Sequence, residues 1–266
     1  MEGGLASSLW TDVEALRRLA RSQRAARGTP LAPDRKAPAG AFPPFPQLPQ
    51  IDLHAMELTQ RLASGDFCDY FLLDRSELAI VMGDVSGKGI PAAVLRGVTR
   101  SVLRQIASGS ISPGSTLARL NRILCEADLG SMFLTLFLGQ YKLSSGLLRY
   151  ANAGHPLPLR IGSKGGIEPF GEVTGPILGI LDSRVYADRE EWLAVEDRLV
   201  LLTDGVTEAR NRAGDFFAPR GLLECLVTHA GASPASICAG LRAGVLAFQG
   251  KRAQDDATVL VLQRRL

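Results

Sequence analysis

Aspartate residues recur where apolar segments of this sequence begin or end. Asp84 closes the apolar run that starts at Leu78, Asp204 follows the run 198–203, and Asp66 and Asp255 each precede an apolar segment. A carboxylate at the tip of a buried strand is costly unless its charge is compensated. If these tips converge, a pair of divalent cations would offset the repulsion, and carboxylate oxygens suit Mg²⁺ or Mn²⁺.

Each of these sites also has a simpler interpretation. An aspartate followed by glycine at a strand end, such as Asp204 before Gly205, is most often a turn residue. That all four are only turn residues is the less favoured interpretation. Asp69 and Asp256 are weaker candidates, because a strand tip usually presents one acid to a metal. The chain has only three histidines, which disfavours zinc.

Composition is ordinary for a soluble globular protein and gives no argument for a nucleic-acid or membrane partner, so we expect neither nucleic-acid binding nor a membrane span. The chain has 266 residues, of which 46% are hydrophobic and 21% charged, with a net charge of +3. No apolar stretch approaches the roughly 18 residues of a membrane helix, and the N-terminus does not resemble a signal peptide. The four cysteines form no CxxC pair, so we expect reduced thiols in a cytoplasmic protein.

The elements that must position the acids alternate between groups of strands and pairs of helices. Alternating and apolar runs predict strands over 67–73, 78–85, 132–143, 147–151, 157–161, 185–195, 198–203 and 258–263. Helical patterns cover 89–107, 112–127, 219–230 and 234–248. Most strands are sequential, so we expect mainly antiparallel sheets covered by helix layers, in the α+β class.

The first 50 residues differ from the rest of the chain. An amphipathic helix is predicted from about residue 9 to 27, with Leu9, Val13, Leu16 and Ala20 on one face. A proline-rich linker follows. We therefore predict an N-terminal region, 1–50, and a main domain, 51–266. The helix is either a solvated helix at the edge of the fold, a dimerisation or regulatory helix, or a binder of acidic surfaces.

Five motifs together resemble the PPM family, the metal-dependent type 2C serine/threonine protein phosphatases, and most closely its bacterial sporulation-protein-E-like, partner-switching branch. The resemblance runs from about Phe45 to the C-terminus, and five motifs in this order are highly specific. The motifs span residues 65–70 (GDFCDY), 83–93 (GDVSGKGIPAA), 151–156 (ANAGHP), 203–209 (TDGVTEA) and 255–258 (DDAT). The resemblance implies an α-β-β-α sandwich.

It also implies a two-metal site. Asp84 would bridge both ions, and the Val85 carbonyl would bind one of them. Asp66 would complete the coordination of the second ion. Asp204 and Asp255 would complete the coordination of the first. Asp256 stands where many members carry Asn. Two such ions would lower the pKa of a shared water, which then attacks phosphorus without a covalent phosphoenzyme.

Several positions depart from the better-known eukaryotic members or have open roles. Ser86 stands where those members carry a histidine, and Arg61 is a weak match for their phosphate-binding arginine. Lys88 is either a phosphate contact or a solvated turn residue. His155 either approaches the site or organises its own loop. Glu208 either supports the site or faces solvent.

The resemblance implies hydrolysis of phosphoserine or phosphothreonine on a protein, often an anti-anti-sigma-type regulator in signalling and stress response. Two alternatives remain open. One is an inactive, partner-binding member of the same fold. The other is a different two-metal phosphoester hydrolase. The sequence does not identify the substrate protein, the metal used in cells or the oligomeric state, and a homodimer through the N-terminal region is one option.

Overall fold

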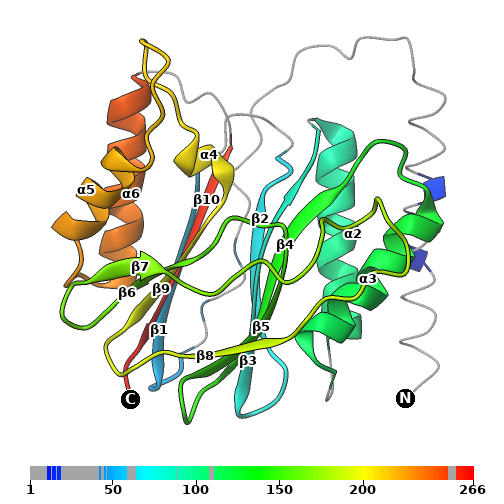
Figure 1. Cartoon of the computed structure of the whole chain (residues 1–266), viewed down its shortest axis with the longest axis horizontal. Coiled ribbons are helices and arrows are strands. Elements are labelled where there is room, and N and C mark those ends of the chain that lie inside the picture. The colour runs from blue at the N-terminus through cyan, green and yellow to red at the C-terminus, as the bar shows by residue number, and fades with distance from the viewer. Residues whose placement is uncertain are drawn as a thin grey trace.

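Two five-stranded antiparallel sheets pack against each other in the computed structural model (Figure 1). The structure describes residues 11–12, 14–15, 17–18, 42, 45, 47–58, 64–87, 89–107, 111–250 and 256–266. The first sheet has the order β1-β10-β9-β6-β7: β1 Ile51–Leu58, β10 Ala257–Arg264, β9 Arg198–Leu202, β6 Leu159–Ile161 and β7 Ile167–Pro169. The second has the order β2-β3-β4-β5-β8: β2 Phe67–Leu72, β3 Glu77–Val85, β4 Leu134–Lys142, β5 Leu147–Ala153 and β8 Arg189–Trp192.

Helices cover the outer face of each sheet. α2 (Ile90–Ile106) and α3 (Pro113–Ala127) lie on the second sheet, and α5 (Arg220–Thr228) and α6 (Pro234–Gln249) on the first (Figure 1). The short α4 (Asp204–Thr207) follows β9 directly. The predicted α-β-β-α sandwich is therefore confirmed. Of the described helices, none is both long and apolar enough to cross a membrane.

Local sequence sets the helix starts. Ser112 and Ser233 cap α3 and α6, because each hydroxyl accepts a hydrogen bond from the backbone N–H three residues on. Proline occupies the first turn of both helices, where its missing N–H costs nothing.

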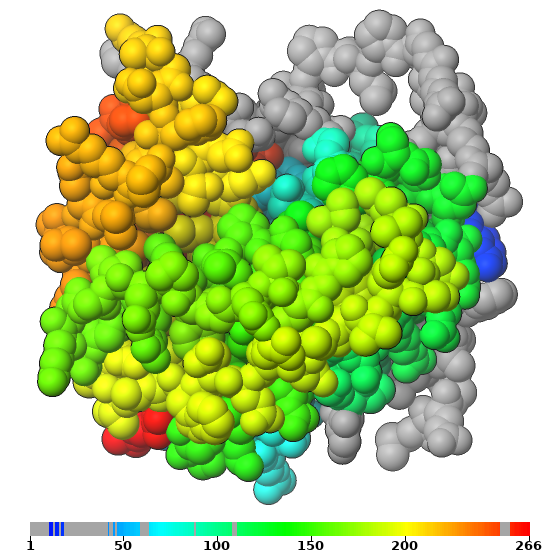
Figure 2. All heavy atoms as spheres, in the orientation of Figure 1, coloured from blue at the N-terminus to red at the C-terminus, as the bar shows by residue number. Residues whose placement is uncertain are grey.

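Three apolar clusters hold the layers together. One lies between the sheets and includes Ile80 and Leu260, one lies under α2 and α3, and one lies under α5 and α6. β10 is buried along nearly its whole length because it is covered on both faces. The segment from β6 in the first sheet to β8 in the second, light green to yellow in Figure 2, crosses one face of the molecule.

The predicted elements agree with the structure except at a few places. The strand expected over 185–195 is shorter: only Arg189–Trp192 pairs with β5, and Val185 is 82% exposed. β1 was not predicted, although its alternating residues Ile51, Leu53 and Ala55 are buried. The brief β7 and α4 were also not predicted, because each is too short to show a period.

The N-terminal region contacts the main domain at the points that the structure describes. The described residues between 11 and 18 are helical, and the Asp12 carboxylate accepts hydrogen bonds from Ser101 and Gln105 on α2, both at 2.7 Å. Phe45 stacks on His54 and Tyr70. Leu9, Val13, Leu16 and Ala20 lie outside the described residues, so their apolar face remains a prediction.

An ion pair links α2 to β2. Asp69 is 1% exposed, and its carboxylate receives hydrogen bonds from Arg104 at 2.7 and 2.6 Å and from Arg100 at 3.4 Å. The Arg104 guanidinium also lies 4.7 Å from the ring centre of Phe71. Asp69 is two residues after the buried Phe67 in β2, so both side chains lie on the helix-covered face of the sheet.

Replacing Arg104 with methionine should destabilise the fold. Arg104→Met keeps most of the apolar stem but leaves the buried Asp69 carboxylate with only the Tyr70 N–H at 3.0 Å and Arg100 at 3.4 Å as hydrogen-bond partners among the described residues, so we expect a loss of about 2 kcal/mol in the free energy of unfolding by urea denaturation. Arg119→Met, on the exposed side of α3, is the control and should change this energy by less than about 0.5 kcal/mol. Equal effects of the two variants would contradict a stabilising role for the ion pair.

Candidate metal centre

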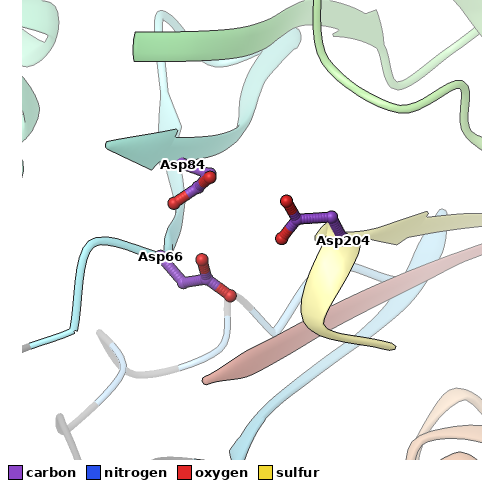
Figure 3. A group of neighbouring side chains, drawn as sticks. All are labelled: Asp66, Asp84 and Asp204. Carbon is purple, nitrogen blue, oxygen red and sulfur yellow. The ribbon is translucent and has the colours of Figure 1, made fainter. Parts of the chain in front are cut away.

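Three aspartates from separate parts of the chain converge at one end of the sandwich. Asp66 precedes β2, Asp84 is the penultimate residue of β3, and Asp204 opens α4, separated from the end of β9 by one residue. One carboxylate oxygen from each lies within 4.8 Å of the others, and the three side chains point toward a common space (Figure 3). Asp66 is buried, Asp84 is half-buried and Asp204 is exposed, so the cluster opens to solvent on the Asp204 side.

Glycines allow the backbone to pack tightly around this cluster. A Cβ on Gly65 would lie 2.5 Å from the Val85 carbonyl oxygen and 3.3 Å from Asp84 Oδ1. A Cβ on Gly205 would lie 1.8 Å from the Asp256 carbonyl oxygen. Neither position can take a side chain without backbone movement, which explains why glycine adjoins both Asp66 and Asp204.

Burial and mutual repulsion disfavour the ionised form of Asp66. Desolvation raises the pKa of this carboxyl well above its ordinary value, and the neighbouring Asp84 carboxylate raises it further. A hydrogen bond from Thr203 acts in the opposite direction, and the more distant charge of Asp204 adds a small increase. Carboxylates that raise one another's pKa in this way form an environment that a cation would stabilise.

Thr203 is a polar residue of this site to which the sequence analysis gave no role. Its side chain is fully buried, and its hydroxyl donates to Asp66 Oδ2 at 2.5 Å. The Thr203 hydroxyl oxygen also accepts a hydrogen bond from the Thr258 N–H at 2.9 Å. A threonine directly after the apolar run 199–202 and directly before a candidate ligand is the signal that could have identified it.

The other predicted site residues are placed as follows. The Val85 carbonyl lies beside Gly65, next to the Asp84 carboxylate. Asp69 is paired with arginines of α2 and is not part of the three-acid group. Asp255 lies outside the described residues. Asp256 is half-buried and close enough to Glu57 to raise the pKa of that carboxyl, although burial is the larger cause.

His155 organises its own loop and lies between the two sheets. Its backbone N–H donates to Asn152 Oδ1 at 2.7 Å, and its carbonyl accepts from Asn152 Nδ2 at 3.0 Å. The ring Nδ1 is 2.9 Å from the Thr135 hydroxyl. Burial lowers the pKa of His155 to about 3, while the nearby backbone of Leu202 acts weakly in the opposite direction. These hydrogen bonds support the loop-organising interpretation of this residue.

The remaining candidates have structural or surface roles where the structure describes them. The Ser86 hydroxyl accepts the Phe133 N–H at 2.7 Å, and the Ser86 N–H donates to the Phe133 carbonyl at 2.9 Å. Ser86 thus anchors the turn after β3. Glu208 faces solvent. Lys88 and Arg61 lie outside the described residues.

Comparison with known protein families identifies the chain. The sequence profile of the stage II sporulation protein E (SpoIIE) family matches residues 74–265. The chain belongs to the SpoIIE family. The family profile includes Asp84, Asp204 and the His155 loop, so two of the three clustered acids lie within the matched region.

Relatives in the SpoIIE family cover most of this chain. It is 30% identical over 221 residues to the phosphoserine phosphatase RsbU of Bacillus subtilis, which covers 83% of this chain and 65% of that protein. It is 32% identical over 248 residues to the protein IcfG of Synechocystis, covering 83% of this chain and 39% of IcfG. The chain therefore spans less than two thirds of the length of these relatives.

Solved structures share the fold. The RsbU and RsbW domains of a Mycobacterium tuberculosis protein superpose with a TM-score of 0.71 at 27% identity, covering 81% of this chain and 60% of that one. The PP2C phosphatase domain of SpoIIE from Bacillus subtilis, with a fragment of its regulatory domain, gives 0.70 at 20% identity, covering 81% and 64%. The second likeness concerns the fold alone.

His155 should contribute to acid sensitivity. The pKa of His155 is about 3 in the folded state, against an ordinary value of 6.5. Between these two pH values the imidazole is protonated in the unfolded chain but not in the folded one. The stability of the wild-type protein should therefore fall, relative to His155→Gln, as the pH drops from about 6.5 towards 3. Urea denaturation of both proteins between pH 8 and 4.5 measures this. The difference should be constant above pH 7, and a difference that stays constant down to pH 4.5 would contradict a buried neutral imidazole.

Proposed function

We propose that this chain is a metal-dependent phosphatase that removes phosphate from serine or threonine on a protein. The observation that carries the proposal is the convergence of Asp66, Asp84 and Asp204 in a chain of the SpoIIE family. Similarity to the phosphoserine phosphatase RsbU supports the reaction class. The bacterial partner-switching relatives favour an anti-anti-sigma-type phosphoprotein as the substrate.

The donor set fits a hard divalent cation. Carboxylate oxygens of Asp66, Asp84 and Asp204 lie together, and the Val85 carbonyl lies beside Asp84. Oxygen ligands of this kind suit Mg²⁺ or Mn²⁺ rather than zinc. We propose two ions, held by these four groups and by Asp255, with Asp84 shared between them and Asp256 and Asp69 as weaker candidates. Bound ions of this kind supply Lewis-acid stabilisation and activation of water.

The chain's own residues would prepare the site for this chemistry. The half-buried Asp84 would hold the charged centre together with Asp66, and the exposed Asp204 would face the entering phosphoprotein. Apolar packing below the site would exclude bulk water from the buried side. The neutral His155 would add no positive charge that competes with a cation.

Partners and location follow from the same proposal. The partner is a phosphorylated protein, with no role in binding nucleic acid, and the enzyme would act in the cytoplasm. Residues 1–50 would form a regulatory region in front of the domain 51–266, with dimerisation through that region as one form of control. The hydrogen bonds from α2 to Asp12 favour contact between this region and the domain.

Removal of divalent metal should abolish turnover. Protein treated with EDTA and then freed of chelator should not hydrolyse p-nitrophenyl phosphate or a serine-phosphorylated anti-anti-sigma-type protein, and Mn²⁺ or Mg²⁺ should restore both activities, because the carboxylates alone cannot activate water. Elemental analysis of the treated protein is the control. Full turnover by verified metal-free protein would contradict the mechanism, and hydrolysis of single-stranded DNA in preference to the phosphoprotein would favour another phosphoester hydrolase.

Asp84→Asn should lower kcat on either substrate by at least about 100-fold, because we propose that this residue is shared by both ions and its carboxylate lies within 4.8 Å of Asp66 and Asp204. In the absence of metal, its thermal midpoint should hold or rise, since repulsion of Asp66 is removed. Asp69→Asn is the matched comparison and should reduce kcat less in the folded fraction, because Asp69 pairs with arginines. A larger kcat loss for Asp69→Asn would overturn this assignment.

A further inference from the structure

A single buried hydroxyl connects the two sheets at the acidic cluster. Thr203 directly follows β9 of the first sheet, and Asp66 precedes β2 of the second, 137 residues away in the chain. The Thr203 hydroxyl donates to Asp66 Oδ2 at 2.5 Å. Both residues are buried, so water does not readily replace this contact.

The direction of this hydrogen bond is fixed by its surroundings. A hydroxyl has one proton to donate, and the Thr203 oxygen already accepts the Thr258 N–H at 2.9 Å. The backbone N–H of Thr203 in turn donates to the Thr258 carbonyl at 3.1 Å. Because a carboxylate that binds a metal is ionised and can only accept, the Thr203 hydroxyl donates its proton to Asp66 Oδ2 in the metal-binding form.

The same residue also sets the start of α4. The Thr203 carbonyl accepts the Val206 N–H at 3.1 Å, and Asp204 is the next residue in the chain. Thr203 thus contacts Asp66 through its side chain, Asp204 through the peptide bond and the segment after Asp256 through Thr258. Three of the acid-bearing segments meet at this one residue.

We propose that Thr203 is a positioning residue for the metal centre: its hydroxyl fixes the orientation of the Asp66 carboxylate relative to Asp84 and Asp204. The inference rests on the proposed function, because it takes Asp66 as a metal ligand. Partners that orient a ligand in this way typically change metal affinity by about 10- to 100-fold when they are lost. Serine retains the hydroxyl, whereas valine has the shape of threonine without it.

The test compares binding of Mn²⁺ by isothermal titration calorimetry to the full-length metal-free chain and its variants. Thr203→Val should weaken Mn²⁺ binding about tenfold or more, and Thr203→Ser should stay within about threefold of wild type. Thr203→Ala replaces the valine variant if that variant does not fold, with the same expected loss. Titration measures binding without requiring turnover, so it does not depend on finding the substrate.

Thr116→Val is the matched control, because it also removes a fully buried hydroxyl, one that donates to the Ser112 carbonyl at 3.0 Å in α3, far from the acids in the fold. It should lower the thermal midpoint but leave Mn²⁺ affinity unchanged.

If Thr203→Val loses stability and keeps wild-type affinity, Thr203 is only structural and the inference is overturned. Asp66→Asn separates the two proposals: if it weakens binding while Thr203→Val does not, only the role of Thr203 fails. If Asp66→Asn leaves binding unchanged, the proposed metal site fails and this inference fails with it.

Discussion

Repulsion between Asp66 and Asp84 is the constraint that the structure around the site must satisfy. Two carboxylates held close together and partly out of water destabilise each other, and the raised pKa of Asp66 expresses that cost. Apolar burial elsewhere must offset it. The three clusters between and outside the sheets supply this burial, so the fold stabilises a site that would be unfavourable by itself.

The sandwich also determines which acids can meet. Asp84 and Asp204 lie near strand ends in different sheets, so the separation of the sheets sets the separation of their carboxylates. The inter-sheet core, with residues such as Ile80 and Leu260, fixes that spacing. Because densely packed interiors resist compression, the acids are held in place by packing some distance away.

Sequence predicted the layers and the three clustered acids, since both depend on local patterns. Apolar runs ending in aspartate and glycine identified Asp84 and Asp204, and the serine-proline starts marked α3 and α6. What sequence could not supply was the partner of each polar group. Asp69 belongs to the same motif as Asp66, yet it faces α2, because three residues of extended chain turn it to the helix-covered side. The link from Thr203 to Asp66 spans 137 residues, so no local pattern predicts it.

His155 shows how a polar group can join the sheets without changing the charge of the site. It reaches Thr135, which pairs with Asp84 in the register of β3 and β4, while the backbone of Leu202 lies on its other side, two residues before Asp204. A charged imidazole at this place would attract the carboxylates and compete with a cation for them. Burial keeps the ring neutral, with a pKa of about 3, so the ring adds no positive charge beside the acids. Near the acidic cluster, two neutral groups of the described residues, the imidazole of His155 and the hydroxyl of Thr203, thus connect the two sheets, and their neutrality would preserve the attraction of the proposed site for a divalent ion.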